Sequence, residues 1–291
     1  MSAPPPDFQI FTTLRYDPLL LTLPTHNPPL THAGYNHTTQ SPFYMLPYHR
    51  DRLLASAKHF NFSQKAIDLL TSPSALQTLS QTITSQIPDH HPSSPPHRVR
   101  VAISPDGTIS VTASEIPPVP LSNLFPSSLP SSPGPTTTTN PSINPDDIFQ
   151  VLVDTNSRTN PSEYTHYKTT SRKSYDSARE RAGIVNPADK KEVLIVDESS
   201  QEVMEASITT PYFFRESKWV TPLVREQHQR QEQQQTPEKY QGGQDGTSRR
   251  WALETGIATE AKILVNSLVD GEQCWLSNGA RGFFPGVIRL A

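Results

Sequence analysis

The sequence has little of several features that define common classes of protein. Cysteine occurs only at Cys274, so no disulfide can form within the chain, and a reducing compartment is favoured. The 25 basic and 28 acidic side chains leave a formal net charge of −3, which provides no strong field to attract a nucleic acid. The longest early apolar run, Leu19–Leu23, is far too short to span a bilayer. We therefore expect a soluble, cytoplasmic protein that binds neither nucleic acid nor membrane.

Motifs of several enzyme classes are absent as well. The chain has no phosphate-binding loop, no dinucleotide fingerprint, no Gly-x-Ser-x-Gly and no His-Glu-x-x-His pattern. Ten histidines are present, and three of them, His90, His91 and His97, lie in a proline-rich stretch. No paired cysteine or spaced carboxylate accompanies them, so we expect no metal site.

Proline is abundant and divides the chain. The 30 prolines are about twice the usual share, and nine of them lie between Pro117 and Pro145 among serines and threonines. Such a composition cannot offset its ordering entropy by apolar burial, which predicts a linker over residues 117–145. The predicted domains are therefore 8–116 and 146–291. A glutamine-rich stretch at 225–244 predicts a surface insertion in the second domain.

Hydrophobic periodicity predicts an α+β fold with two domains. In the first domain it predicts a strand over 8–16, helices over 46–60 and 73–87, and a hairpin of 97–104 with 108–114. In the second it predicts helices over 170–182 and 247–256 and short strands at 148–153, 193–196, 203–205 and 212–214. Apolar runs at 263–268 and 274–276 are too short to assign. The second domain is therefore expected to be larger and rich in short strands.

Six short segments stand in an order that resembles one enzyme family. They are Tyr48-His-Arg-Asp-Arg-Leu53, His166-Tyr-Lys168, Met204-Glu-Ala-Ser207, Trp219-Val-Thr-Pro222, Gly246-Thr-Ser-Arg-Arg-Trp251 and Trp275-Leu-Ser-Asn-Gly-Ala-Arg-Gly282. Together they resemble the fold-type IV pyridoxal-phosphate enzymes, which include branched-chain and D-amino-acid aminotransferases and 4-amino-4-deoxychorismate lyase. The resemblance implies a D-amino-acid aminotransferase-like fold of a small N-terminal α+β domain and a larger C-terminal domain. It also places pyridoxal 5′-phosphate at the interdomain cleft.

The resemblance assigns the two residues that this cofactor needs most. Pyridoxal phosphate requires a lysine that binds its aldehyde and moves protons, and a carboxylate that keeps its ring nitrogen protonated. By resemblance these are Lys168 and Glu205. On position alone Lys168 reads as a surface lysine, and Glu205 reads as a solvated strand residue. The family motif around each residue favours the functional role.

The remaining site residues are also assigned by resemblance. The cofactor phosphate requires cationic and amide donors, which the family pattern places at Arg52, at Gly246, Thr247 and Ser248, and at Ser277, Asn278 and Gly279. Substrate carboxylates require cations, for which Arg15 and Arg281 are candidates, each equally readable as a salt-bridge residue. Thr12 or Thr13 is expected to give a proton to a departing product, and the sequence does not choose between them.

Three functions stay open at this point. The segments Phe11-Thr-Thr-Leu-Arg15 and Arg249-Arg-Trp-Ala-Leu-Glu254 look most like aminodeoxychorismate lyases, particularly those of fungi. The first expectation is therefore a lyase that converts 4-amino-4-deoxychorismate to pyruvate and 4-aminobenzoate, the folate precursor. The alternatives are an aminotransferase of the same fold and a non-catalytic protein whose proline-rich tract binds partners. The expected partner is a small-molecule substrate. The resemblance also allows a homodimer, which the sequence does not decide.

Overall fold

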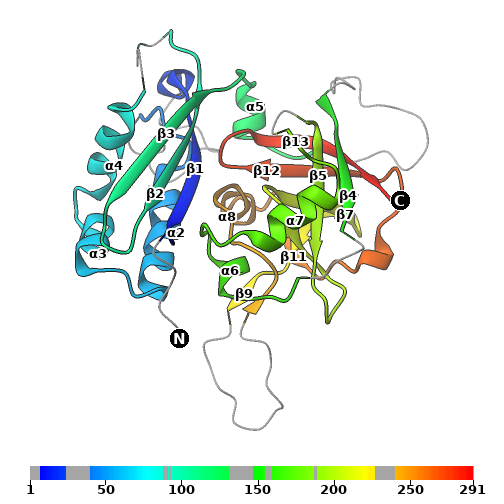
Figure 1. The fold of residues 1–291 in the computed structure, drawn as a ribbon. Coiled ribbons are helices and arrows are strands. Elements are labelled where there is room, and N and C mark those ends of the chain that lie inside the picture. The colour runs from blue at the N-terminus through cyan, green and yellow to red at the C-terminus, as the bar shows by residue number, and fades with distance from the viewer. Residues whose placement is uncertain are drawn as a thin grey trace. The chain divides into compact units, whose positions relative to one another are not determined.

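The computed structural model describes residues 7–23, 40–87, 91, 93–130, 147–154, 159–186, 189–226 and 240–290. Contacts divide the chain into two units (Figure 1). The first unit comprises Met1–Pro126 together with two short segments from later in the chain, Tyr167–Ser171 and Gly279–Gly282. The second comprises Ser127–His166, Arg172–Asn278 and Phe283–Ala291. The α+β class and the two-unit organisation expected from the sequence are confirmed.

The first unit is built on a three-stranded antiparallel sheet with the order β1-β2-β3. Its strands are β1 (Ile10–Tyr16), β2 (His97–Ile103) and β3 (Ile109–Glu115). Because side chains alternate along a strand, Ile10 and Leu14 of β1 face the same side as Val99 of β2. These three residues are fully buried and belong to one hydrophobic core. Phe11 and Thr13 therefore point to the opposite face of the sheet.

Helices pack on the core face of this sheet (Figure 1). They are α2 (Leu46–His59), α3 (Gln64–Thr71) and α4 (Ala75–Thr84). Leu53 and Ala57 of α2, four residues apart, and Leu79 of α4 contribute to the core, as helical spacing requires. The helix α3 was not predicted. A short 3₁₀ helix, η1 (Pro18–Thr22), follows β1, and Asp17 caps it by accepting from the Leu19 N–H at 3.0 Å.

The edge of β1 opposite β2 pairs with a segment far away in the sequence. The Phe11 N–H donates to the Lys168 carbonyl at 3.0 Å, and the Thr170 N–H donates to the Gln9 carbonyl at 2.9 Å. Residues 168–170 therefore have extended pairing, which explains why α7 (Lys173–Arg181) begins at residue 173 and not at 170 as the periodicity predicted. Gly183 then ends the helix region with a φ of +64°, a conformation that glycine favours.

The second unit contains an eight-stranded mixed sheet with the order β11-β8-β7-β12-β13-β4-β5-β6. Its strands are β4 (Phe149–Val153), β5 (Lys191–Val196), β6 (Val203–Ala206), β7 (Thr210–Arg215), β8 (Lys218–Pro222), β11 (Thr259–Ala261), β12 (Gln273–Asn278) and β13 (Gly282–Arg289). The pairs β4 with β5, β4 with β13 and β8 with β11 are parallel. Strands β8, β11 and β13 were not predicted. Cys274–Leu276 lies in β12, and Ile263–Leu268 contains the 3₁₀ turn η4 (Val265–Ser267) and a single bridge from Leu264 to Glu202.

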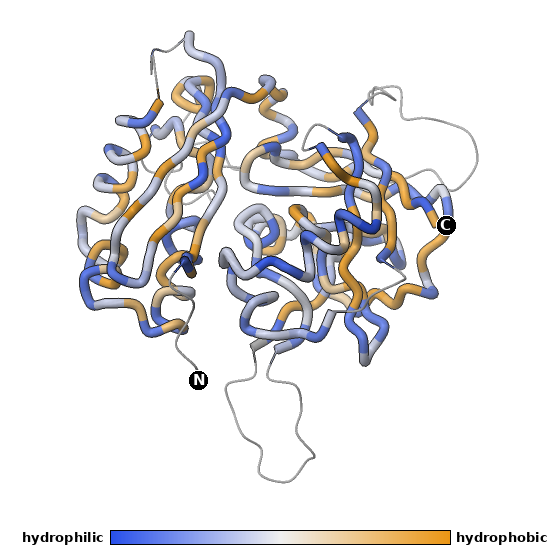
Figure 2. Tube along the Cα trace, viewed as in Figure 1, coloured by the Kyte–Doolittle hydropathy of each residue, from blue (hydrophilic) through white to orange (hydrophobic). Residues whose placement is uncertain are grey.

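Three helices accompany this sheet, α6 (Glu163–His166), α7 and α8 (Thr247–Glu254). Tyr175 and Ala178 of α7 pack against Val193, Ile195 and Met204 of β5 and β6. The rest of α7 is polar and appears largely blue in the hydropathy view (Figure 2). A two-stranded pair, β9 (Arg225–Glu226) with β10 (Tyr240–Gln241), flanks the glutamine-rich stretch.

Part of the predicted linker is packed. Residues 117–130 include the helix α5 (Leu121–Leu124), with Leu124 and Leu129 buried. The Tyr44 hydroxyl donates to the Leu124 carbonyl at 2.6 Å, and the Trp219 indole donates to the Leu129 carbonyl at 3.0 Å. A few leucines among the prolines thus give this stretch the apolar burial that its overall composition lacks. Residues 131–145, His90 and residues 227–239 of the predicted insertion lie outside the described residues.

Two further properties bear on the expected partners. Within the described ranges, no helix has the length and apolar character needed to cross a membrane. In the same ranges, no three or more His, Cys, Asp or Glu side chains gather where they could hold a metal ion.

Candidate functional site

Lys168 is fixed through its backbone and carries its amine over an aromatic ring. Besides the bond from Phe11 to its carbonyl, the next residue, Thr169, forms a bridge with Ile10. The Lys168 Nζ lies 5.2 Å from the centre of the Phe11 ring, and the side chain is half-buried. The guanidinium carbon of Arg100 lies 4.1 Å from the centre of the same ring. Lys168 is therefore presented at a defined place, with a second cation nearby.

His49, Thr12 and Arg52 form a hydrogen-bonded group in the same unit. Thr12 Oγ1 lies 2.6 Å from His49 Nδ1 and also accepts a hydrogen bond from Arg52 Nη2. His49 and Arg52 are three residues apart on α2 and so share one helix face. Burial first, and then the charges of Arg52 and Lys168, lower the pKa of His49 well below its usual value. A neutral imidazole can accept at Nδ1, which lets Thr12 donate to His49 while it accepts from Arg52.

Gly279 closes against this group. A Cβ at this position would lie 2.6 Å from the Thr13 carbonyl oxygen and 2.7 Å from the His49 Cε1, distances that no side chain tolerates. Glycine is therefore required for the chain to approach His49 so closely. The predicted residues Thr12, Arg52 and Gly279 thus meet around His49, which the sequence did not single out.

The two predicted substrate arginines differ in their surroundings. Arg15 is fully buried, and its Nε donates to Asp17 at 2.7 Å. Its two terminal nitrogens donate to the carbonyls of Ala280 and Pro117, each at 3.2 Å. These contacts favour a structural role for Arg15, because each of its nitrogens has an intramolecular acceptor. Arg281, by contrast, is exposed.

In the second unit, the Glu205 carboxylate is held from two sides. Glu205 lies on β6 opposite Ile195 of β5 and is 9% exposed. Its Oε1 accepts a short hydrogen bond from the Tyr175 hydroxyl and another from the Gln244 N–H at 3.2 Å. A Cβ at Gly243 would lie 2.4 Å from the Glu205 Cδ, so only glycine lets the backbone pass there. Glu205 is thus a buried carboxylate in a fixed orientation.

A second group of polar residues surrounds the start of α8. Gly246 is the N-cap and supplies no side-chain oxygen to the first amides of the helix, those of Thr247 and Ser248. The Ser248 and Ser277 hydroxyls lie 2.8 Å apart, and the Tyr212 hydroxyl lies 2.9 Å from Ser277. Burial raises the pKa of Tyr212 far above its usual value, so its hydroxyl keeps its proton. A helix N-terminus beside buried hydroxyls is suited to an anion.

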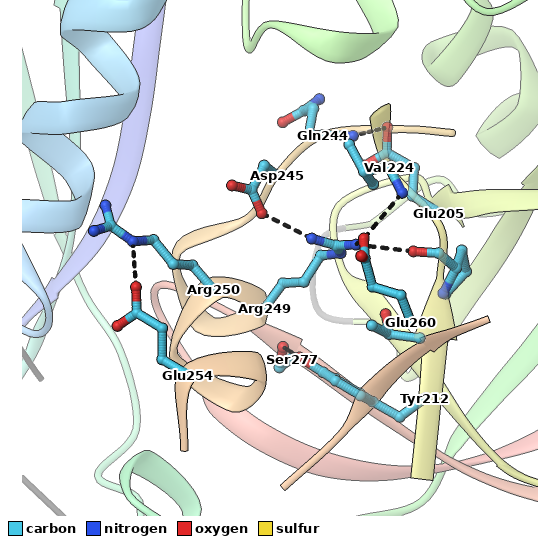
Figure 3. A network of polar contacts seen from close by, with 12 residues as sticks. Glu205, Tyr212, Val224, Gln244, Asp245, Arg249, Arg250, Glu254, Glu260 and Ser277 are labelled. Atoms are coloured by element: carbon cyan, nitrogen blue, oxygen red, sulfur yellow. Dashed lines mark hydrogen bonds and ion pairs between the residues drawn. The ribbon is translucent and has the colours of Figure 1, made fainter. Parts of the chain in front are cut away.

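Arg249 anchors this helix terminus (Figure 3). Its buried guanidinium donates to Asp245 at 2.9 Å, to Glu260 through a short bond and to the Pro222 carbonyl at 3.1 Å. Glu260 also accepts from the Val224 N–H at 3.3 Å. Two carboxylates therefore compensate a buried cation one residue beyond Ser248, which fixes the helix relative to β8 and β11. Neither the arginine nor its partners were singled out as site residues by sequence reasoning.

Comparison with known proteins identifies the family. The model of the amino-transferase class IV family matches residues 36–287, most of the chain. The chain belongs to this family. No curated protein matches it at a significant level. The class IV family depends on pyridoxal phosphate, as the resemblance implied.

Solved structures share the fold of this class IV chain at low identity. One is a Mesorhizobium loti protein provisionally described as an amino-acid aminotransferase, with a TM-score of 0.59 and 19% identity, covering 98% of this chain and 100% of that one. Another is 4-amino-4-deoxychorismate lyase from Pseudomonas aeruginosa, with a TM-score of 0.53 and 13% identity; the match covers 97% of this chain and 83% of that one. A third is the branched-chain amino acid aminotransferase from Escherichia coli, with a TM-score of 0.53 and 14% identity; the match covers 96% of this chain and 75% of that one. Both activities occur on this fold, so the fold does not choose between them.

The residues present fit the chemistry of pyridoxal phosphate. An aldehyde requires an amine, which Lys168 offers over the Phe11 ring. A phosphate dianion requires a cation, amides and hydroxyls; the first unit has the cation Arg52, and the second has the amides of the α8 terminus and the hydroxyls of Ser248 and Ser277. A protonated ring nitrogen requires a carboxylate held in place, as Glu205 is. Each unit also has a close backbone approach that only glycine allows, at Gly279 in the first and at Gly243 in the second.

Proposed function

We propose that this class IV enzyme is a 4-amino-4-deoxychorismate lyase, which forms pyruvate and 4-aminobenzoate in folate biosynthesis. The observation that carries the proposal is the placement of Thr13. Thr13 and Phe11 lie on one face of β1, and the Lys168 amine lies over the Phe11 ring on that face. A hydroxyl is therefore available on the side of the strand where the lysine is presented, as a lyase that protonates its leaving group requires.

The proposed cofactor-binding residues keep their sequence-based roles. Lys168 binds the aldehyde carbon, and Glu205 faces the ring nitrogen. The phosphate is bound by a guanidinium, by amides and by hydroxyls. These belong to Arg52, Gly246, Thr247, Ser248, Ser277, Asn278 and Gly279. When bound, pyridoxal phosphate supplies an electron sink that stores the pair released at the substrate carbon.

Two proton transfers by side chains complete the reaction. The Lys168 Nζ removes the proton from the ring carbon that bears the substrate amine. The ether bond to the enolpyruvyl oxygen breaks, the ring becomes aromatic, and the enolpyruvyl methylene carbon takes a proton from the Thr13 Oγ1 as that oxygen receives the proton held by Lys168. Thr12 is a weaker candidate for this donor, because its hydroxyl is engaged by His49 and Arg52. The β-strand alternation thus favours Thr13 over Thr12 as the proposed donor.

Arg100 is the proposed cation for a substrate carboxylate. It pairs with Thr13 directly across the β1–β2 ladder, and its guanidinium lies over the Phe11 ring. Its side chain is on the same face as Thr13 and is exposed. Arg15 has its nitrogens engaged internally, so Arg100 and Arg281 are the better candidates. The signal in the sequence is the alternation His97-Arg-Val-Arg-Val101, which places arginines opposite the core face.

A product assay tests the function. Purified full-length protein with pyridoxal phosphate is incubated with 4-amino-4-deoxychorismate, and 4-aminobenzoate and pyruvate are measured. We expect equal amounts of both, without loss of the cofactor's aldehyde form. Formation of a keto acid with amine retained on the cofactor would instead assign a class IV aminotransferase of the branched-chain or D-amino-acid type. Failure to bind pyridoxal phosphate at all would overturn both and leave a non-catalytic role.

A further inference from the structure

Tyr175 is a buried phenol that the reaction described above does not use. It is 1% exposed and lies on α7, and its hydroxyl contacts Glu205 Oε1 and, at 3.3 Å, the Thr165 carbonyl. The Gln244 N–H donates to the same Glu205 oxygen (Figure 3). Two donors on separate elements therefore converge on one carboxylate oxygen.

The raised pKa of Tyr175 keeps its hydroxyl a hydrogen-bond donor. Burial first, and then the charge and hydrogen bond of Glu205, raise the pKa of Tyr175 well above its usual value. The guanidinium of Arg172, 4.8 Å from the ring centre, opposes this shift without cancelling it. The phenol thus keeps its proton at neutral pH and can donate to the carboxylate.

The helix that carries Tyr175 is tied to the chain just beyond Glu205. Arg172 donates to the Ser207 carbonyl at 2.8 Å, and Arg179 donates to the Ser207 hydroxyl at 2.9 Å. Residues 172, 175 and 179 have the spacing of one helix face. All three side chains therefore reach Glu205 or Ser207, at the C-terminal end of β6.

The buried Glu192 completes this attachment. Its carboxylate accepts from the hydroxyls of Ser207 and Thr209 and from the Ile208 N–H, and it lies 3.8 Å from Arg179. These polar contacts, together with the packing of Tyr175 and Ala178 against β5 and β6, set where the helix lies. The position of the Tyr175 hydroxyl is therefore determined by residues that surround Glu205 itself.

We propose that Tyr175 is a positioning residue that orients the Glu205 carboxylate toward the ring nitrogen of the cofactor. The inference rests on the proposed function only in that Glu205 faces this nitrogen. A carboxylate with one oxygen fixed by a hydroxyl and an amide has its rotation restricted, so its second oxygen has a defined direction. Tyr175 then contributes to cofactor affinity through the ring nitrogen alone and has no part in holding the phosphate.

A pair of cofactors isolates this contribution. The dissociation constants of the full-length apoprotein for pyridoxal phosphate and for its 1-deaza analogue, in which carbon replaces the ring nitrogen, are measured by fluorescence. In Tyr175→Phe we expect the constant for pyridoxal phosphate to rise about tenfold, as for a lost hydrogen bond to a charged group. The constant for the analogue should stay unchanged. Tyr44→Phe, which removes another buried tyrosine hydrogen bond, is the matched control and should change neither constant.

Each outcome decides the inference. Partial unfolding weakens the binding of both cofactors by the same factor. The ratio of the two dissociation constants therefore measures the contribution of the ring nitrogen even in a destabilised variant. If Tyr175→Phe does not fold, Arg179→Met, which loosens α7 but keeps the hydroxyl, should shift the ratio in the same direction. An unchanged ratio overturns the role of Tyr175 while leaving the enzyme assignment intact. Absence of pyridoxal phosphate binding by the wild-type protein overturns the proposed function instead.

Discussion

The His49 imidazole and the Thr12 hydroxyl are joined by a hydrogen bond, with 2.6 Å between Nδ1 and Oγ1, and both side chains are buried. This bond connects α2 to β1 in the first unit. Because Arg52 donates to the same hydroxyl, the position of the proposed phosphate-binding arginine depends on a histidine one helical turn before it.

The burial of neutral His49 should make stability depend on pH. Its pKa is lowered in the folded state, so below about pH 6.5, the usual value for histidine, the unfolded chain takes up a proton that the folded chain does not. The free energy of unfolding should then fall as the pH falls, by up to about 1.4 kcal/mol per pH unit. Urea unfolding of wild type and His49→Asn between neutral and mildly acidic pH measures this contribution. The slope should be shallower in the variant, and His91→Asn, at an exposed histidine, should keep the wild-type slope.

Loss of the Lys168 amine should abolish turnover while preserving the fold. Lys168→Ala removes the proposed base but keeps the carbonyl that pairs with Phe11, so we expect a rate loss of at least about a thousandfold with an unchanged melting temperature. Borohydride reduction followed by mass spectrometry should detect covalently attached cofactor in wild type only. Lys173→Ala, at an exposed lysine of α7, serves as the control and should retain both rate and adduct. Appreciable lyase rate in Lys168→Ala is incompatible with its proposed role.

Two arginines of α2 should differ in their effect on cofactor affinity. Arg52→Ala is expected to raise the dissociation constant for pyridoxal phosphate by about ten- to a hundredfold, since it removes a charged donor. Arg50 pairs with Asp51 at 2.8 Å on the outside of the helix, so Arg50→Ala should leave the constant unchanged. Equal effects of the two substitutions would show that the net charge of the helix matters and that Arg52 has no specific contact.

Arg100 should affect the substrate and not the cofactor. In Arg100→Leu we expect KM for aminodeoxychorismate to rise about tenfold, while the dissociation constant for pyridoxal phosphate stays the same. Arg98→Leu is the matched control, because Arg98 is exposed on the same face of β2 two residues earlier. Steady-state kinetics with both variants separate the two positions, and an equal rise in KM would point to general attraction by charge.

The glutamine-rich stretch should be dispensable. Its flanks are already paired in the antiparallel ladder that joins Tyr240 to Glu226, and shortening a polar connection changes its closure entropy only slightly. Deletion of residues 227–235 should therefore leave the melting temperature and the lyase rate close to those of wild type. A large loss of either would assign this stretch a function that its composition does not suggest.

Local periodicity was a reliable guide where one face of an element meets one core. The strand and hairpin of the first unit and the helices α2, α4 and α8 follow from such patterns, because a buried face imposes its period on the sequence. Strand β13 was missed because its run, Gly-Phe-Phe-Pro-Gly-Val-Ile-Arg, has a proline and two glycines and no clear alternation. Its parallel pairing with β4, which is distant in the sequence, stabilises this strand despite its composition.

The residues of the candidate site divide in a similar way. The sequence, through its resemblance to a family, indicated Lys168, Arg52 and Glu205, because the cofactor demands an amine, a cation and a carboxylate and the family motifs give their order along the chain. It could not indicate His49 or Tyr175 as partners of these residues. Their importance lies in contacts between segments 30 to 37 residues apart.

By itself, then, the sequence determined the class of fold and the family and supplied the proposal for the reactive groups, since these depend on local pattern and residue chemistry. Only the tertiary structure decided that Arg15 is occupied by Asp17, that Thr13 and Thr12 face opposite sides of β1, and that Tyr175 holds Glu205. Strand register and helix packing set these relationships. They are long-range properties, because the partner of each side chain is chosen by how the whole chain fills its core.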